Sequence, residues 1–486
     1  KAESMETEDY LALFYPFDQL DVVKQGVESR WSVSGDNMMM ALTMTFINEP
    51  MAKTMSFQRE YAEAYDWVAQ QFKDWAFTLT TSILYYNDYD LIDEETQKKR
   101  VGWKEYPMYR YGLTQAMPDM CLEVCEEGGV KGVWIQTSNG IACMSCETER
   151  WYKAMKKPEF IAACDVFMTP MIQSCADIVL PVQTWAEKHS VRAHYYFLSA
   201  ITGGCAAEGE ALSDCEINRR LAQYFDNDDE FNKAINRPEG KQHTWPWETE
   251  DEVYDEIVKP SGFTFHELME QGPVYQKYIY KKYEKGLMRP DGAPGFNTPT
   301  GRVELYNLGF QQFGDDPLPY YEEPDFSPIS TPELLKDYPF VLTTGARTYA
   351  FFHSEHRQIP RLRELNPNPL VEINPQTAQK LGIVDGQWCR VYNQFGEAHL
   401  KAKLTASVKP DVIHAQHGWW FPEEDGNAPH NYGVYRSNIN NLIPNFHVGK
   451  LGFGAPFKCM LCNIEGTNEN FDTDMQLIQD KFGELR

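Results

Sequence analysis

Apolar and polar positions follow two different periods in the middle of the chain. Residues 132–135 (GVWI) form a short apolar run, and residues 160–167 (FIAACDVF) form a second. Residues 146–156 between them have helical spacing, and a third apolar run follows at 176–181 (ADIVLP). Apolar strands joined through a helix are typical of a βαβ unit with a parallel sheet. We therefore expect an α/β domain over residues 126–230.

The last third of the chain has a different pattern. Residues 340–345 (FVLTTG) and 370–373 (LVEI) are short apolar runs. Residues 398–404 alternate strictly between apolar and polar side chains, and a Gln-Phe-Gly turn leads into them from a run at 387–393. Several short strands with one helix predict a small β-barrel over residues 336–486.

Helix ends are marked by individual residues. Asn374 is a favoured N-cap, Pro375 suits the first helical position, and Gly382 suits the position just past the end. Ser213 and Glu216 have the spacing of a capping box, which predicts that a helix begins there.

The other segments are less regular. Residues 1–125 are rich in Met and aromatic residues, and we expect mainly helical structure left from upstream domains, with a packing helix at 51–76. Residues 231–335 are expected to be a loop-rich insertion and linker. Within them, residues 296–306 predict a turn that leads into a strand.

Composition favours a folded chain of more than one domain. The 486 residues, 42% of them hydrophobic, exceed what one core usually serves. A net charge of −26, from 45 basic and 71 acidic residues, disfavours nucleic acid as a partner. No apolar run approaches the length of a transmembrane segment. The chain begins at Lys1, so we expect a processed chain or a fragment; any export signal lies upstream, and cytoplasmic and exported locations both stay open.

Cysteines offer one alternative chemistry. Eleven cysteines are an odd number, which favours reduced thiols over a disulfide framework. The pairs Cys143/Cys146 and Cys459/Cys462 have the spacing of a four-thiolate zinc site, although they lie far apart in the chain. No GxGxxG, P-loop or HExxH motif is present, so those nucleotide and zinc sites have no support.

A cluster of basic residues follows Gly345, which stands at the end of the predicted strand. Hydroxyl residues and Gly at a strand end let backbone N–H groups approach an anion. Arg347 and Arg357 add bidentate recognition of phosphate. The cluster, which includes His353 and His356, has the chemistry of a diphosphate or pterin-phosphate site. The residues alone slightly favour the alternative, a solvated polar loop in which the two arginines simply pair with acidic neighbours.

Two other features favour structural roles. The run at 418–422 (GWWFP) favours a place in a core over the lining of a funnel. The remaining scattered histidines are interpreted as satisfied polar residues rather than metal ligands; they are His189, His194, His414 and His417.

Four stretches, taken in order, resemble the dimethyl sulfoxide reductase family of molybdenum and tungsten enzymes. The stretch that resembles the family's dinucleotide-binding sheet is residues 165–170 with 176–181 and Glu187, and the stretch that resembles the segment after that sheet is residues 209–210 with 213–217. Residues 296–306 resemble the family's TPSGK-type strand. The stretch that resembles the C-terminal barrel is residues 342–361 with Asn374, Pro375, residues 381–383, Asp385, Gly386 and Gly396.

The resemblance implies a parallel-sheet dinucleotide-binding domain, a double-psi-type β-barrel, and bis-molybdopterin guanine dinucleotide with Mo or W. Met171 stands where the family usually has a small hydroxyl residue, and Gly140 where Pro is common. The residues implied to contact a guanosine are Ser138, Asn139, Gly140, Asp165, Thr169 and Asp177. Those implied to hold pterin and phosphate are Thr343, Thr344, Gly345, Arg347, His353, Ser354, Asn440 and Lys458.

The family's metal ligand and its 4Fe-4S motif have no match in this sequence, so the catalytic residues stay unknown. The implied partners are the N-terminal half of the same enzyme, an iron–sulfur electron-transfer subunit and a small-molecule substrate. The runs 417–422 and 456–462 resemble the branch with acetylene hydratase and the catechol dehydroxylases of gut bacteria. Reductive dehydroxylation of a catechol is the first expectation. Hydration, or reduction of an inorganic oxyanion or sulfur compound, is the alternative, and a cofactor-free scaffold subunit is the alternative of another class.

Overall fold

The computed structural model describes thirteen stretches of the chain. They are residues 125–126, 132–136, 138–143, 147–194, 197–226, 247–258, 262–275, 279–289, 291–296, 300–303, 305–306, 316–444 and 458–483. The predicted helix at 51–76 lies outside them. The described residues fall into two compact units. The barrel unit comprises those within Cys121–Val179, Tyr320–Gly449 and Phe453–Arg486, and the hairpin unit those within Leu180–Pro319.

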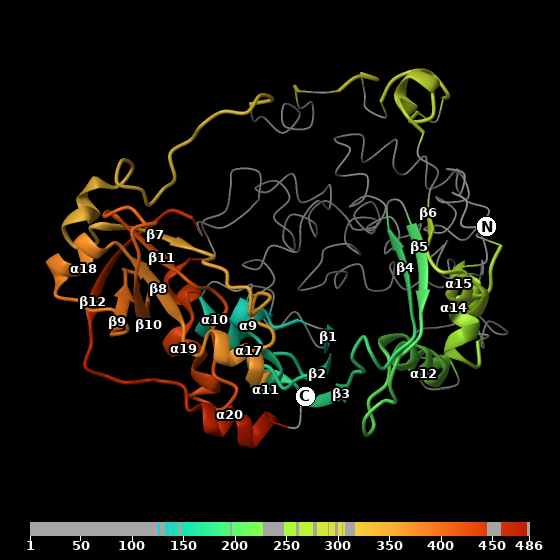
Figure 1. Ribbon diagram of the computed structural model, residues 1–486, viewed down its shortest axis with the longest axis horizontal. Coiled ribbons are helices and arrows are strands. Elements are labelled where there is room, and N and C mark those ends of the chain that lie inside the picture. The colour runs from blue at the N-terminus through green and yellow to red at the C-terminus, as the bar shows by residue number, and fades with distance from the viewer. Residues whose placement is uncertain are drawn as a thin grey trace. The chain divides into compact units, whose positions relative to one another are not determined.

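The barrel unit contains a small sheet, a closed barrel and short helices (Figure 1). In chain order its elements are β1 (Gly132–Gln136), α9 (Gly140–Cys143), α10 (Thr148–Ala154), β2 (Phe160–Asp165), α11 (Pro170–Cys175), the start of β3 (Ile178–Pro181), a 3-10 helix Pro332–Lys336, β7 (Phe340–Thr344), α17 (Pro360–Leu365), β8 (Leu370–Ile373), α18 (Pro375–Leu381), β9 (Trp388–Tyr392), β10 (Glu397–Leu404), β11 (Val412–Ala415), a 3-10 helix Asn431–Gly433, α19 (Val434–Ser437), a 3-10 helix Ile439–Leu442, β12 (Met460–Gly466) and α20 (Met475–Phe482).

The predicted βαβ pattern is confirmed. The sheet has the order β1-β2-β3, and β1 pairs with β2 in parallel. Helices α9 and α10 connect these two strands. The buried run Ile161 to Cys164 fills the middle of β2. Because parallel strands share an orientation, the loops after β1 and β2 leave the sheet at the same edge.

The predicted small barrel is also confirmed. Six strands close in the order β10-β8-β11-β7-β12-β9. The alternation in β10 places Ala398, Leu400 and Ala402 inside, where they are buried with Leu342 and Ile413. Period-two patterning therefore decides which face of each strand enters the core.

Helix α18 forms as its end residues predict. The side chain of Asn374 accepts a hydrogen bond from the backbone N–H of Gln376 at 2.9 Å, and Pro375 occupies the first helical position. Gly382 ends the helix with φ 72°, a left-handed conformation that glycine adopts without a Cβ penalty.

Buried asparagines join the sheet segment to the barrel segment of this unit. Asn438 donates to the carbonyls of Ile141 and Ala142 at 3.3 and 3.0 Å. Asn431 donates to the hydroxyl of Ser174 at 2.6 Å. Because a buried polar group costs free energy when it is unpaired, these bonds fix how the two segments meet.

In its described residues the hairpin unit contains, besides the end of β3, two longer antiparallel strands, a short third strand, three α-helices and a 3-10 helix. Its core gathers Leu198, Tyr254, Val258, Phe265 and Leu268. Its elements are the end of β3, β4 (Ser190–His194), β5 (Phe197–Ile201), α12 (Asp214–Asp226), α14 (Glu250–Val258), α15 (Phe265–Gln271), β6 (Val274–Tyr275) and a 3-10 helix Lys282–Lys285.

The helix predicted to begin at Ser213 is confirmed as α12, but its capping box and one predicted strand need correction. The Ser213 hydroxyl does accept from the N–H of Glu216 at 2.9 Å, but the Glu216 carboxylate binds Arg219 and Arg220 instead of closing a capping box. The strand predicted within residues 296–306 does not form in the described residues 296, 300–303 and 305–306, which are turn, bend or irregular. The side chains of Val303 and Leu305 are 64% and 81% exposed there, so no burial of apolar surface stabilises a strand.

Helices in the described parts of the chain are all too short or too polar to cross a membrane.

Candidate cofactor-binding site

The predicted phosphate-binding residues lie at one end of the barrel. Strands β7 and β11 pair in parallel, so their carboxyl ends lie side by side. The N–H of Ala346, just past β7, donates to the carbonyl of Ala415, the last residue of β11, at 3.2 Å. The loops after these strands carry the residues of the site.

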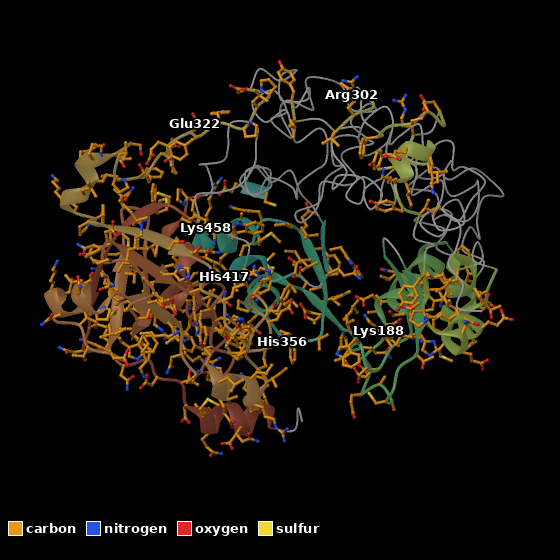
Figure 2. All side chains as sticks on the ribbon, turned by 45° about the horizontal axis from the view of Figure 1, so that its top comes forward. Lys188, Arg302, Glu322, His356, His417 and Lys458 are labelled. Atoms are coloured by element: carbon orange, nitrogen blue, oxygen red, sulfur yellow. The ribbon has the colours of Figure 1, made fainter. Side chains whose placement is uncertain are left out.

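Two glycines let the backbone and side chains approach closely there. Gly345 has φ 90°, and a Cβ at this position would lie 2.7 Å from Nζ of Lys458. Gly418 has φ 67°, and its Cβ would meet the backbone of His353 and Ser354 at 3.3 to 3.4 Å. Lys458 donates from Nζ to the carbonyl of Thr344 at 2.6 Å. Lys458 and His417 lie in the same part of the barrel unit (Figure 2).

Arg347, His353 and His417 form a row of hydrogen bonds. Nη2 of Arg347 lies 3.4 Å from Nε2 of His353, and Nδ1 of His353 lies 3.0 Å from Nε2 of His417. A guanidinium only donates, so Nε2 of His353 accepts and its Nδ1–H donates onward. The tautomers follow: the proton of His417 resides on Nδ1, the last donor of the row.

Both imidazoles are neutral at pH 7. Burial, followed by the charges of Arg347 and Arg357, lowers the pKa of His353. Burial, with His353 and Arg357 beside it, lowers the pKa of His417 to about 4. Neutral rings retain the acceptor nitrogens that the row requires.

Arg357 is a buried cation that binds carbonyl groups. It is 2% exposed, and its guanidinium donates to the carbonyls of His353 at 2.9 Å and His417 at 3.4 Å. Its charged group lies 4.8 and 4.9 Å from the ring centres of Phe351 and Trp419. The interpretation of Arg357 as a solvated residue paired with acidic neighbours is therefore wrong.

Asn139 connects this loop to the sheet. Its Nδ2 donates to the hydroxyl of Ser354 at 3.1 Å, and its Oδ1 accepts from the N–H of Met171 at 3.4 Å. The thiol of Cys143 also forms a hydrogen bond with Ser354, and burial raises the pKa of this thiol. The indole of Trp420 donates to the carbonyl of Ser354 at 2.8 Å. Trp419 to Phe421 are fully buried, so the core interpretation of the aromatic run is confirmed.

Residues of the sheet predicted to contact guanosine make local bonds. Asp165 accepts from the N–H groups of Val166 and Phe167, and Thr169 caps α11. Asp177 accepts from the N–H of Ile161 at 2.8 Å. Ser138 precedes α9, and Gly140 begins it, at the sheet edge that also holds Asp165.

Two predicted residues of the barrel lie beside the main group. Thr343 pairs with His414 in the β7–β11 register. Asn440 donates from Nδ2 to the carbonyl of Cys143 at 3.2 Å. The structure thus brings together Asn139, Thr344, Gly345, Arg347, His353, Ser354 and Lys458.

Sequence reasoning missed His417 as a member of this group. Its contacts with His353 and Arg357 span about sixty positions of sequence and depend on closure of the barrel. The available signal was Gly418, directly after His417 at the end of an apolar run, the same arrangement as Thr344 and Gly345.

The group fits an anionic ligand. Arg347, Arg357 and Lys458 bond imidazole and carbonyl groups, and none of the described carboxylates forms an ion pair with them. Nε of Arg357 is buried, and no partner for it appears among the described residues. Glu355 in the same loop acts on Arg357 by its charge without forming an ion pair with it. Three cations with one such carboxylate nearby, in a chain of net charge −26, suit a phosphate or another anion.

A zinc site has no support from the described cysteines. Cys462 lies in the hydrophobic core of the barrel, where burial raises the pKa of its thiol. Across the described stretches, no three His, Cys, Asp or Glu side chains are placed to share a metal ion. Cys146 lies outside these stretches.

Comparisons with known proteins match the barrel and a larger part of the chain. Residues 340–460 match the molydopterin dinucleotide binding domain. The chain is 32% identical over 280 residues to acetylene hydratase of Syntrophotalea acetylenica, covering 56% of this chain and 35% of that protein. It is 28% identical over 421 residues to dopamine dehydroxylase of Eggerthella lenta, covering 73% of this chain and 40% of that protein.

The fold gives the same result. The solved structure of acetylene hydratase from Pelobacter acetylenicus matches with a TM-score of 0.66 and 25% identity, over 81% of this chain and 55% of that one. The chain spans less than half the length of the two curated relatives above. The barrel therefore matches a molydopterin dinucleotide binding domain, and the chain is similar to acetylene hydratase, to dopamine dehydroxylase and to the dimethyl sulfoxide reductase DmsA of Escherichia coli, with 27% identity over 69% of this chain and 42% of that protein.

Proposed function

We propose that the barrel-end group binds the pterin and phosphate part of a molybdopterin guanine dinucleotide. The observation that carries this proposal is the gathering of Arg347, Arg357 and Lys458 around two positive-φ glycines without carboxylate partners among the described residues. The sheet-edge loops at Ser138–Gly140 and Asp165–Thr169 are proposed to bind a guanosine. The barrel is proposed to be of the double-psi type.

Each part of the group has its own task. Gly345 and Gly418 let Lys458 and the His353–Ser354 backbone pack close to the strand ends, and the cations balance the negative charge of the ligand. The row from Arg347 through His353 ends in the Nδ1–H of His417, which orients an acceptor on the ligand. The metal of such a cofactor supplies two-electron or oxygen-atom chemistry. The metal ligand, a 4Fe-4S cluster and an electron-transfer subunit are proposed to belong to polypeptide outside this sequence.

Cofactor content tests this assignment. The complete enzyme is purified anaerobically, and the guanine nucleotide released by acid is measured together with Mo and W. Lys458→Met is expected to lower the nucleotide content several-fold, because it removes one charge-assisted contact. The matched control is Lys403→Met on the outside of β10, where Nζ pairs with Glu372 at 2.8 Å. A wild-type enzyme free of guanine nucleotide would support the alternative of a cofactor-free scaffold.

For the activity we propose reductive dehydroxylation of a catechol-type aromatic. In this reaction two electrons and two protons convert the catechol to a phenol and water, as a C–O bond breaks and a C–H bond forms. The support is the similarity to dopamine dehydroxylase over 73% of the chain. The buried aromatic run does not contribute, because its side chains lie in the core.

A second candidate is hydration, supported by the similarity to acetylene hydratase in both sequence and structure. The two are separated by assaying the complete enzyme with dopamine plus a reduced viologen dye, and with acetylene without a reductant. Viologen oxidation that depends on dopamine supports dehydroxylation, whereas acetaldehyde from acetylene supports hydration. Viologen oxidation that depends on dimethyl sulfoxide or an oxyanion instead would support the third candidate, reduction of such a compound.

A further inference from the structure

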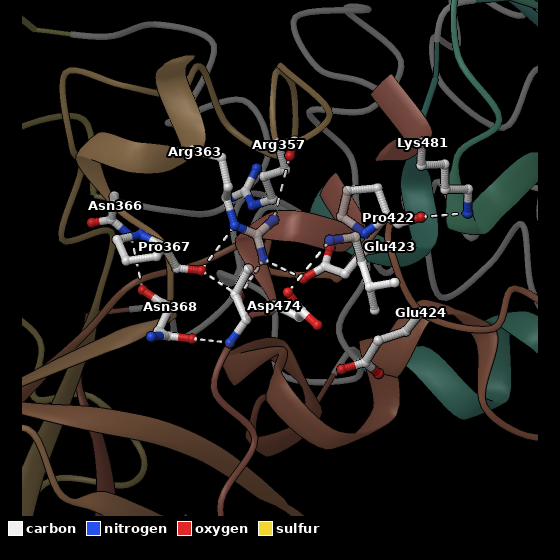
Figure 3. A network of polar contacts seen from close by, with 12 residues as sticks. Arg357, Arg363, Asn366, Pro367, Asn368, Pro422, Glu423, Glu424, Asp474 and Lys481 are labelled. Atoms are coloured by element: carbon white, nitrogen blue, oxygen red, sulfur yellow. Dashed lines mark hydrogen bonds and ion pairs between the residues drawn. The ribbon is translucent and has the colours of Figure 1, made fainter. Parts of the chain in front are cut away.

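Arg363 lies at the centre of a polar network that also includes Arg357 of the candidate site (Figure 3). Its side chain is fully buried, and the guanidinium pairs with Glu423 at 3.0 Å. Nε donates to the carbonyl of Pro367 at 2.8 Å. A second contact, at 3.4 Å, goes from Nη1 to the carbonyl of Arg357. The network therefore reaches a residue that itself holds the site.

Trp419 connects the two arginines. Its ring centre lies 4.8 Å from the guanidinium of Arg363 and 4.9 Å from that of Arg357. Arg357 in turn donates to the carbonyls of His353 and His417. Because packed aromatic rings and buried hydrogen bonds leave little freedom, the position of Arg363 limits that of Arg357.

The C-terminal segment, residues 472–482, completes this network from outside the barrel. The hydroxyl of Thr473 accepts from Nη2 of Arg363 at 2.8 Å and donates to the carbonyl of Pro367 at 2.6 Å. Asp472 accepts from the indole of Trp388 at 2.9 Å. Lys481 on α20 donates to the carbonyl of Pro422, next to Glu423, at 2.7 Å. Thr473 is the member of this segment that touches Arg363 directly.

We infer that the C-terminal segment positions the His353–His417 pair, acting from Thr473 through Arg363 to Arg357. Thr473 and Arg363 are positioning residues: they touch neither imidazole, and they hold the carbonyl-binding arginine that fixes both loops. The inference concerns this chain's own residues and does not depend on which ligand or reaction the site serves.

Chemical modification of the two histidines tests the inference. Diethyl pyrocarbonate acylates neutral imidazole, and mass spectrometry of peptides gives a rate for each histidine in the complete enzyme. Thr473→Val removes the hydroxyl with little change of shape, and Arg363→Lys removes the planar fork of donors. Either change is expected to raise the rates at His353 and His417 about fivefold, the factor that corresponds to one lost hydrogen bond of about 1 kcal/mol.

A pH profile distinguishes positioning from general loosening. Burial and the charges of Arg347 and Arg357 lower the pKa of His353, so a released loop shifts the midpoint of its modification to higher pH. Thr473→Ser, which keeps the hydroxyl, is expected to retain wild-type rates. The matched control is Arg390→Lys on β9, whose side chain pairs with Glu397 and Glu465 at the surface.

Alkylation of Cys462 reports opening of the barrel core, because this thiol is fully buried there. Faster modification of His353 and His417 with Cys462 still protected supports the inference. Unchanged histidine rates in Thr473→Val, or faster rates matched by equally faster alkylation of Cys462, overturn it.

Discussion

At the scale of single residues, the candidate site depends on histidines kept neutral by their surroundings. His417 has an ordinary pKa of 6.5 and a pKa of about 4 in the folded chain, with burial as the largest cause. Between these values the unfolded chain binds more protons than the folded one. The stabilising contribution of neutral His417 is therefore complete above pH 6.5 and is lost as the pH falls through about 4.

This difference predicts a pH-dependent stability. The shift corresponds to up to about 3 kcal/mol of unfolding free energy. His417→Gln is expected to lose less stability than the wild type between pH 7 and pH 4.5, as measured by urea midpoints. His356→Gln, which removes a partly exposed ring from the neighbouring loop after β7, serves as the control. Equal losses in wild type and His417→Gln would contradict the neutral, buried state of this ring.

The Arg363–Glu423 pair predicts a large coupling energy. Both side chains are almost fully buried, so removing one partner leaves an uncompensated charge. Arg363→Met is expected to cost about 3–5 kcal/mol, and Glu423→Leu a similar amount. The double variant should cost much less than the sum, because no charge is left unpaired. Urea unfolding of the four proteins gives the coupling, and strictly additive losses would argue against a buried pair.

Single residues also show what the sequence could predict of the site. Gly345, Arg347 and His353 follow one strand, so local chemistry was enough to group them, whereas Ser354 was predicted from the family resemblance. Arg357 was placed in the same loop, but its burial under Trp419 depends on contacts across about sixty positions. The partners of such a residue follow from barrel closure, which a one-dimensional pattern does not specify.

At the scale of elements, prediction succeeded where the deciding forces are local. The ends of α18 follow from the conformational preferences of Asn374, Pro375 and Gly382. The strand within residues 296–306 was predicted from the local sequence and from the family resemblance, and it is absent from the described part of that segment. A strand needs a partner and a core, whereas a helix end needs only its own side chains.

Gly382 allows a direct test of a local conformational cost. Its φ of 72° disfavours a side chain, yet a Cβ there would meet no atom within 4 Å. Gly382→Ala is expected to lower the unfolding free energy by about 1 kcal/mol through backbone strain alone. Gly382→Asn should cost less, because Asn tolerates this conformation better. The control is Gly204→Ala, also in open space but without a positive φ; equal urea midpoints for the two Ala variants would rule out the strain.

At the scale of the whole molecule, the asparagine contacts hold the sheet segment and the barrel of one unit in register. They join parts of the chain separated by more than 250 positions, so composition and periodicity gave no indication of them. Asn438 is fully buried and supplies two of the bonds. The candidate site uses loops from both parts, because Asn139 reaches Ser354. Ordering of the site and of this contact should therefore change together.

Asn438→Leu tests that coupling. The apolar side chain is similar in size but leaves the carbonyls of Ile141 and Ala142 without their donor, which costs about 1–3 kcal/mol. Hydrogen exchange is expected to accelerate at the amides of α9 and α11, while amides within β8, β9 and β10 keep their protection. The loop at Ser354 should follow α9, since the Asn139–Ser354 contact depends on the same juxtaposition. Protection that falls uniformly across the barrel strands would instead show that sheet segment and barrel open only as one cooperative body.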